Sequence, residues 1–264
     1  MITLKSDREI EGMQEAGDIL AGLFHELEDY VKPGLSTWDI DNFAYKYIVG
    51  HDATPGELNF EGYKYSTCIS VNDMICHGCP SKDIIVKDGD LIKLDTVIDY
   101  HGYLSDACHA VVVGEPSDEV KKLMDVTLKS LYLGIDQAVV GNRIGDIGNA
   151  IQEYAEDKLG YGVVRDYVGH GIGPTMHEAP DVPHYGKPGH GTRLKAGMTI
   201  TIEPMINVGS FECTEPDEND GWTIRTEDGS LSCQYEHTIV ITDDGPKILT
   251  SFDHELDAKY LWNK

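Results

Sequence analysis

The chain has 264 residues, of which 41% are hydrophobic, and its 46 acidic and 21 basic side chains give a formal net charge of −25. This length is sufficient to bury a substantial core, either as one large domain or as two closely joined halves. A chain this acidic repels phosphate backbones and anionic membrane surfaces, and the sequence shows no basic stripe that would offset this repulsion. Composition therefore excludes direct nucleic-acid binding and favours a globular protein.

Hydropathy and cysteine content predict a soluble, cytoplasmic protein without disulfides. No run of about 18 apolar residues occurs, and residues 1–9 lack the apolar stretch of a signal peptide. The cysteines are too few for a disulfide scaffold at this length, so we expect free thiols. They are Cys68, Cys76, Cys79, Cys108, Cys213 and Cys233.

The first part of the chain predicts two helices followed by strands. Residues 6–9, Ser-Asp-Arg-Glu, form a capping box that begins a helix, and Pro33-Gly34 cannot continue it. A second helix is expected after Ser36. Alternating or β-branched patterns then predict strands over 66–71, 91–95 and 110–113.

The second part repeats this order. Ser117 caps a predicted helix that extends to Ile135, and Ile147 and Ile151 mark its partner. Strand patterns follow at 162–168, 198–202 and 235–241.

Short motifs recur at a nearly constant offset between the two parts. Gly34-x4-Asp39 matches Gly141-x4-Asp146 at an offset of 107 residues, and residues 89–95 match residues 197–203 at an offset of 108. We therefore predict a single α+β domain over residues 1–264, built from pseudo-symmetric halves at about 7–114 and 118–250. The simplest arrangement is one curved antiparallel sheet backed by two pairs of helices.

Asp95 and Asp106 flank a predicted hairpin. A turn centred between Tyr100 and His101 places the two aspartates directly opposite each other. Adjacent carboxylates destabilise a sheet, and a divalent cation between them removes that cost. Both could instead be solvated, but the apolar residues before Asp95 and after Asp106 indicate buried strands.

The repeat pairs two glutamates with these aspartates. Glu203 corresponds to Asp95, and Glu236 corresponds to Asp106 across a longer loop. His170 lies between glycines that leave its ring accessible and could supply a nitrogen ligand. Four carboxylates and one histidine suit a pair of Mn, Fe, Co or Zn ions, and such a site indicates hydrolysis.

The sequence resembles the type I methionine aminopeptidases, which have the pita-bread fold. The similar stretches are 72–78, the hairpin 95–106, 169–173, 176–178, 201–205 and 234–238, and they follow the family's order. The resemblance implies two divalent ions held by Asp95, Asp106, His170, Glu203 and Glu236. It also implies that Glu203 transfers protons, and that His77 and His177 act on the substrate.

The resemblance further implies removal of the initiator methionine from nascent proteins with a small second residue. A metal-bridging hydroxide would attack the scissile carbonyl. Phe60, Tyr63, Cys68 and Trp222 would wall an apolar pocket for the methionine side chain, although core packing alone would also explain them.

Two alternatives within this fold stay open at the level of sequence. A proline-directed aminopeptidase shares the metal ligands but usually carries a large N-terminal domain, whereas helices of the catalytic type begin here at Asp7. A catalytically inactive binding module is disfavoured because all five ligand positions hold competent residues. The partners expected are nascent N-termini with at most transient proximity to the ribosome, and the protein is expected to be a monomer.

Several other features are expected to have no catalytic or metal-binding role. The pair Cys76 and Cys79 has no second cysteine pair that would complete a zinc site. The remaining histidines are expected to pack or to face solvent: His25, His51, His101, His109, His184, His190, His237 and His254. The acidic loop 212–220 is expected to be solvated.

Overall fold

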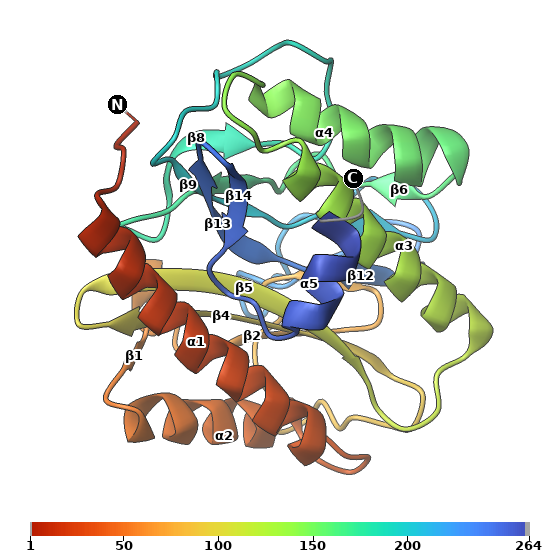
Figure 1. Ribbon diagram of the computed structural model, residues 1–264. Coiled ribbons are helices and arrows are strands. Elements are labelled where there is room, and N and C mark those ends of the chain that lie inside the picture. The colour runs from red at the N-terminus through yellow and green to blue at the C-terminus, as the bar shows by residue number, and fades with distance from the viewer. Residues whose placement is uncertain (1, 262–264) are drawn as a thin grey trace.

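The computed structural model describes residues 2–261. The helices are α1 (Asp7–Tyr30), α2 (Thr37–Gly50), α3 (Asp118–Asp136), α4 (Ile144–Gln152) and α5 (His254–Leu261), with a 3-10 turn η1 (Phe60–Gly62) and a π-helical turn η2 (Glu153–Lys158). In Figure 1, α1 and α2 lie at the lower left and α3 and α4 at the upper right. The predicted order of two helix pairs, each followed by strands, is confirmed.

Local capping explains where the helices begin. The Glu9 carboxylate accepts a hydrogen bond from the backbone N–H of Ser6 at 2.7 Å, and the Asp39 carboxylate accepts one from Ser36 at 2.9 Å. The Ser117 hydroxyl accepts one from the N–H of Val120 at 3.2 Å. Each cap satisfies a backbone donor that has no partner within the helix.

Fourteen short to medium strands form four hydrogen-bonded sheets among the described residues. The first-half sheet contains β1 (Thr54–Pro55), β2 (Cys68–Val71), β4 (Leu91–Tyr100) and β5 (Tyr103–Val112). The second-half sheet runs in the order β14 (Gly245–Ile248), β13 (His237–Thr242), β9 (Thr199–Ile202), β7 (Gly169–Gly171) and β8 (Glu178–Val182). Two small sheets contain β6 (Gly162–Val163), β10 (Met205–Asn207) and β12 (Ser232–Gln234), and β3 (Met74–Cys76) with β11 (Ile224–Arg225).

Hydrogen bonds join the two larger sheets. The N–H of Glu236 donates to the carbonyl of Cys108 at 2.9 Å, and the N–H of Asp106 donates to the Thr238 hydroxyl at 3.0 Å. The buried Lys93 ammonium donates to the carbonyls of both Asn72 and Ser232 at 2.8 Å. The α+β pita-bread fold is therefore confirmed, with its curved sheet divided into separately bonded sections.

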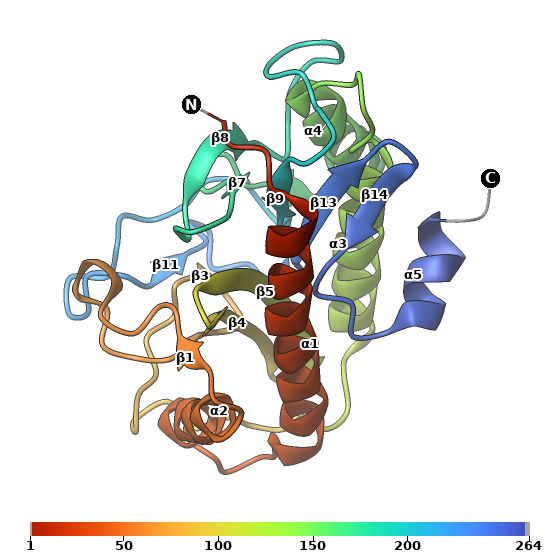
Figure 2. The same ribbon diagram turned by 60° about the vertical axis from the view of Figure 1, so that its left-hand side comes forward.

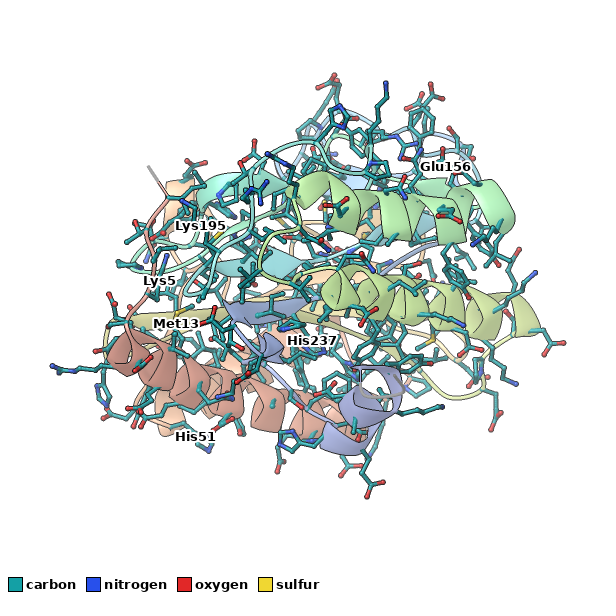
Figure 3. All side chains as sticks on the ribbon, turned by 45° about the horizontal axis from the view of Figure 1, so that its top comes forward. Lys5, Met13, His51, Glu156, Lys195 and His237 are labelled. Carbon is teal, nitrogen blue, oxygen red and sulfur yellow. The ribbon has the colours of Figure 1, made fainter. Side chains whose placement is uncertain are left out.

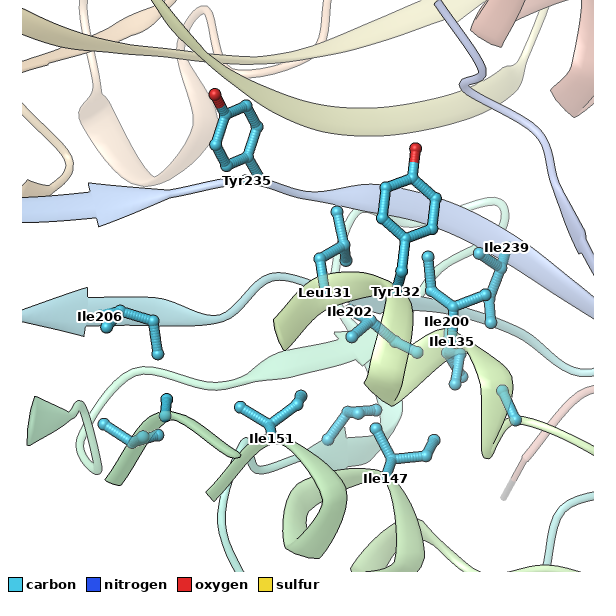
Figure 4. Packing of buried hydrophobic residues seen from close by; sticks show 14 of the residues in the cluster. Leu131, Tyr132, Ile135, Ile147, Ile151, Ile200, Ile202, Ile206, Tyr235 and Ile239 are labelled. Atoms are coloured by element: carbon cyan, nitrogen blue, oxygen red, sulfur yellow. The ribbon is translucent and has the colours of Figure 1, made fainter. Parts of the chain in front are cut away.

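The helices cover the sheets with two main apolar clusters. Beneath α3 and α4, residues such as Leu131, Ile135 and Ile151 pack against Ile200 and Ile202 of β9 (Figure 4). A second cluster packs α1 and α2 against the β4–β5 hairpin. Figure 2 shows α1, α3 and α5 on one side of the molecule and β3 and β11 on the other.

Buried polar groups also lie between the helices. His237, which Figure 3 labels, lies on β13. It is 1% exposed and has a packing role, with its ring nitrogen 3.0 Å from the Thr250 hydroxyl. The cysteines are free thiols, as expected. Among the described residues, no helix combines the length and apolar character needed to cross a membrane.

The predicted register of the hairpin was wrong by one residue pair. Asp95 lies opposite Cys108, and Asp106 lies opposite Val97. The turn is formed by His101 and Gly102, whose φ angles are 54° and 87°. A two-residue hairpin turn of this type requires positive φ at both positions, and glycine adopts that conformation without strain. Because the partner of Asp95 moves by two residues, both aspartates keep the same face and become diagonal neighbours.

Some strand boundaries also differ from the sequence patterns. The pattern 162–168 forms a strand only at Gly162–Val163, and the pattern 235–241 begins as a strand at His237. In the second case, the backbone N–H of Glu236 bonds instead to Cys108 of the other half. A local sequence pattern cannot predict this contact, because the two residues are distant in the chain.

Candidate active site and metal centre

A cavity of about 580 Å³ lies between the two halves of the fold. Its lining includes nearly all of the predicted site residues: Phe60, Tyr63, His77, Asp95, Asp106, His170, His177, Glu203, Trp222 and Glu236. Cys68 is the exception, because it packs behind the cavity wall in a cluster with Tyr63.

The candidate metal ligands come from both halves of the chain. Asp95 and Asp106 project from β4 and β5, His170 lies on β7, and Glu203 and Glu236 flank β9 and β13. The His170 Nε2 atom lies 3.6 Å from Asp106 Oδ2 and 3.6 Å from Glu203 Oε1. Ligand atoms of Asp106, His170 and Glu236 all lie within 4.8 Å of one another. The pseudo-symmetric halves thus supply one clustered set of donors.

The electrostatics of this cluster favour a bound cation. Burial, together with the neighbouring carboxylates, raises the pKa of Asp95, Glu203 and Glu236 well above the usual range. Burial also raises the pKa of Asp106 to about 7. Four buried carboxyl groups cannot all be ionised at neutral pH unless cations compensate their charge.

The donors present fit a metal centre in two further respects. Oε1 of Glu236 is buried and has no hydrogen-bond partner within residues 2–261, as expected for an atom reserved for a ligand. Burial lowers the pKa of His170 to about 4, so its ring is neutral and can coordinate a metal. Nδ1 of this ring lies 3.0 Å from the carbonyl of Gly171, which leaves Nε2 facing the carboxylates.

A second layer of polar groups fixes Glu203. The Thr201 hydroxyl donates to Glu203 Oε1 at 2.8 Å and accepts the N–H of His170 at 2.9 Å. The side-chain amide of Gln234 lies 3.5 Å from Glu203 Oε2. Nε2 of His184 accepts the Glu203 N–H at 3.1 Å, and burial lowers the His184 pKa to about 3.

Sequence reasoning assigned His184 to packing or to the surface, because its link to Glu203 arises from tertiary structure. Thr201 and Gln234, by contrast, lie within stretches that carry the family resemblance.

The two remaining histidines occupy different places in the cavity. His77 follows β3 with a φ of 55°, and its ring lies edge-on to Tyr167 at 5.4 Å between centroids. The His177 ring is exposed and lies 4.3 Å from the His170 ring and 5.4 Å from that of Phe60. Burial lowers the pKa of His77 to about 4, and partial burial also lowers the pKa of His177, so both rings are neutral at pH 7.

The aromatic wall predicted for a methionine side chain forms in part. Trp222 packs edge-on against Tyr63 at 5.1 Å, and both line the cavity with Phe60. The structure adds Glu57, a buried acidic residue that sequence reasoning did not consider. The wall is therefore not purely apolar.

Comparison with known proteins identifies the family of this chain. Residues 11–243 match the model of metallopeptidase family M24. The chain is 46% identical over 250 residues to the methionine aminopeptidase of Clostridium acetobutylicum, covering 95% of this chain and 99% of that protein. This chain belongs to the methionine aminopeptidases of family M24.

Other relatives agree with this assignment. The methionine aminopeptidase of Escherichia coli is 43% identical over 94% of both chains. The crystal structure of methionine aminopeptidase from Rickettsia prowazekii superposes with a TM-score of 0.92 at 39% identity, covering 95% of this chain and all of that one. Membership of this family makes the protein a hydrolase that depends on divalent metal.

A likeness to proline-directed enzymes extends to the fold alone. The Xaa-Pro dipeptidase from Bacillus anthracis superposes with a TM-score of 0.75 at 24% identity. The match covers 94% of this chain but 62% of that one.

Proposed function

We propose that this protein removes the N-terminal methionine from polypeptides whose second residue is small. The observation that carries the proposal is the buried cluster of Asp106, His170 and Glu236, whose ligand atoms lie within 4.8 Å of one another in the cavity that also holds His77 and His177. A metal centre beside neutral histidines is suited to hydrolysis of a peptide bond.

We propose that two divalent ions bind to Asp95, Asp106, His170, Glu203 and Glu236. Mn, Fe, Co and Zn all accept this set of oxygen and imidazole ligands. When bound, the ions would activate the hydrolytic water and polarise the scissile carbonyl.

Glu203 is the proposed proton carrier. Thr201 donates to one of its carboxylate oxygens, and Gln234 lies near the other. In this fixed orientation Glu203 accepts a proton from the attacking water and passes it to the leaving amine.

The histidines are proposed to hold the substrate. His177, beside His170, binds the oxygen that develops negative charge, and His77, near Trp222, binds near the scissile nitrogen. Crowding between these two rings would limit the size of the second residue. Phe60, Tyr63 and Trp222 would receive the methionine side chain.

We also propose how the protein works in the cell. Because the ligands come from both halves, residues 1–264 act as one catalytic unit. Its substrates are the N-termini of nascent polypeptides in the cytoplasm, met in transient proximity to the ribosome.

A peptide panel Met-X-Ser, with X from Gly to Trp, tests the selectivity. We expect kcat/KM to fall steeply once X exceeds valine in size, since a larger side chain collides with His77 or His177. Equal rates for Met-Gly-Ser and Met-Trp-Ser would contradict the proposed placement of both rings. Leu-Ala-Ser serves as the control for selection of the first residue.

A further inference from the structure

Glu57 lies at a break in the edge of the first sheet. The N–H of Gly56 donates to the carbonyl of Val97 at 2.8 Å, and the chain then leaves β4 and returns to it at Cys68. Glu57 is the first residue of the loop 57–67, which also places Phe60 and Tyr63 in the cavity wall. The residue is only 9% exposed and contacts the cavity.

The carboxyl group of Glu57 has an unused polar atom. Oε2 is buried and lacks a hydrogen-bond partner among residues 2–261. The Cys68 thiol can donate one hydrogen bond to the same carboxyl group. Since buried polar atoms are almost always paired, Oε2 indicates a missing partner.

The surroundings favour the neutral acid. No lysine or arginine of the described chain lines the cavity. Burial is the main reason that the pKa of Glu57 is raised well above the usual range. A protonated carboxyl group is a hydrogen-bond donor, and a donor in an aromatic wall requires an acceptor.

We propose that Glu57 is a specificity-determining residue that donates a hydrogen bond to the thioether sulfur of the first residue of the substrate. The inference rests on the proposed methionine-removing function and adds a polar element to its side-chain pocket. Phe60, Tyr63 and Trp222 select the shape of an unbranched chain. Because the Tyr63 hydroxyl already donates to the carbonyl of Thr67 at 2.9 Å, Glu57 provides the donor that distinguishes sulfur from methylene.

The wild-type enzyme provides the first test through three substrates of similar shape. They are Met-Ala-Ser, norleucine-Ala-Ser and O-methylhomoserine-Ala-Ser, in which the sulfur is replaced by a methylene group or by an ether oxygen. If the pocket contains a hydrogen-bond donor, the methionine and O-methylhomoserine substrates should both have a higher kcat/KM than the norleucine substrate. A purely apolar pocket ranks the ether lowest, because it must bury an unpaired oxygen. An ether ranked below norleucine would overturn the proposal.

Variants provide the second test. Glu57→Met removes the donor and should reduce the preference for methionine over norleucine by about three- to tenfold, the range of one neutral hydrogen bond. Glu57→Gln keeps a donor and should retain the preference. Glu119→Met is the matched control, because Glu119 is an exposed glutamate that does not line the cavity.

The outcomes separate this proposal from the function on which it rests. If Glu57→Met lowers the rates for methionine and norleucine equally, Glu57 has only a structural role and the proposal is wrong. Efficient cleavage of Lys-Ala-Ser by the wild type would also overturn it, since that result requires an ionised Glu57. Failure of the wild type to cleave Met-Ala-Ser would refute the proposed function itself.

Discussion

At the scale of single residues, the cavity contains two distinct groups, the proposed metal ligands and the histidines proposed to contact substrate. The ligand cluster is buried and acidic, whereas His77 and His177 are neutral rings set on the walls of the same cavity. Glu236 has a buried oxygen without a protein partner among residues 2–261, which fits its proposed role as a metal ligand.

We therefore predict opposite phenotypes for substitutions of the two groups. His77→Ala and His177→Ala should each lower kcat and kcat/KM about a hundredfold or more while metal stoichiometry is unchanged, because a transition-state contact is lost. Glu236→Ala should lower the metal content. Elemental analysis measures the metal content, and steady-state kinetics measures kcat and kcat/KM. Metal loss in either histidine variant would contradict the substrate-binding role proposed for that histidine.

The sequence predicted which carboxylates gather in the cavity better than it predicted the groups around them. Asp95, Asp106, Glu203 and Glu236 could be found because the repeat places a carboxylate at corresponding strand ends. Glu57 and His184 were not identified from the sequence, because the evidence for them is their burial and their contacts with residues distant in sequence.

At the scale of elements, the turn of the β4–β5 hairpin sets the positions of two proposed ligands. His101 and Gly102 both have positive φ, so the turn sets the register that brings Asp95 and Asp106 to one face. Helix starts were predictable because capping is local. The hairpin register was not predictable, because a turn at residues 100–101 and a turn at residues 101–102 fit the same alternating pattern.

We predict that Gly102→Ala lowers the free energy of unfolding by about 1 kcal/mol, because a Cβ atom is strained at a φ of 87°. Gly50→Ala is the matched control. A Cβ atom meets open space at both positions, but Gly50 lies in α2 without a positive φ. Urea denaturation of both variants measures the difference, and equal stability would contradict the strain assigned to the turn.

At the scale of the whole molecule, the net charge is −25, and acidic residues also surround the mouth of the cavity. Glu61, Asp166 and Asp181 are exposed and line it, and the described lining contains no basic residue except histidine. Such a field attracts cationic peptides and repels anionic ones, and dissolved salt screens it.

We expect Met-Ala-Lys-Lys to exceed Met-Ala-Glu-Glu in kcat/KM by about tenfold at an ionic strength of about 0.01 M, where the Debye length is long. The ratio should fall to about two near 1 M, where it is short. Met-Ala-Ser-Ser controls for general effects of salt. A ratio that is independent of salt would exclude a role for the acidic mouth.

The central claim is that a metal centre in this cavity removes N-terminal methionine. The most direct measurement is cleavage of Met-Ala-Ser and of a Gly-Pro peptide by metal-depleted protein and by protein reconstituted with Mn, Fe or Co. We predict no turnover without metal, recovery on reconstitution, and a strong preference for Met-Ala-Ser. Full activity in protein shown by elemental analysis to be metal-free, or faster cleavage of the Gly-Pro peptide, would contradict the claim.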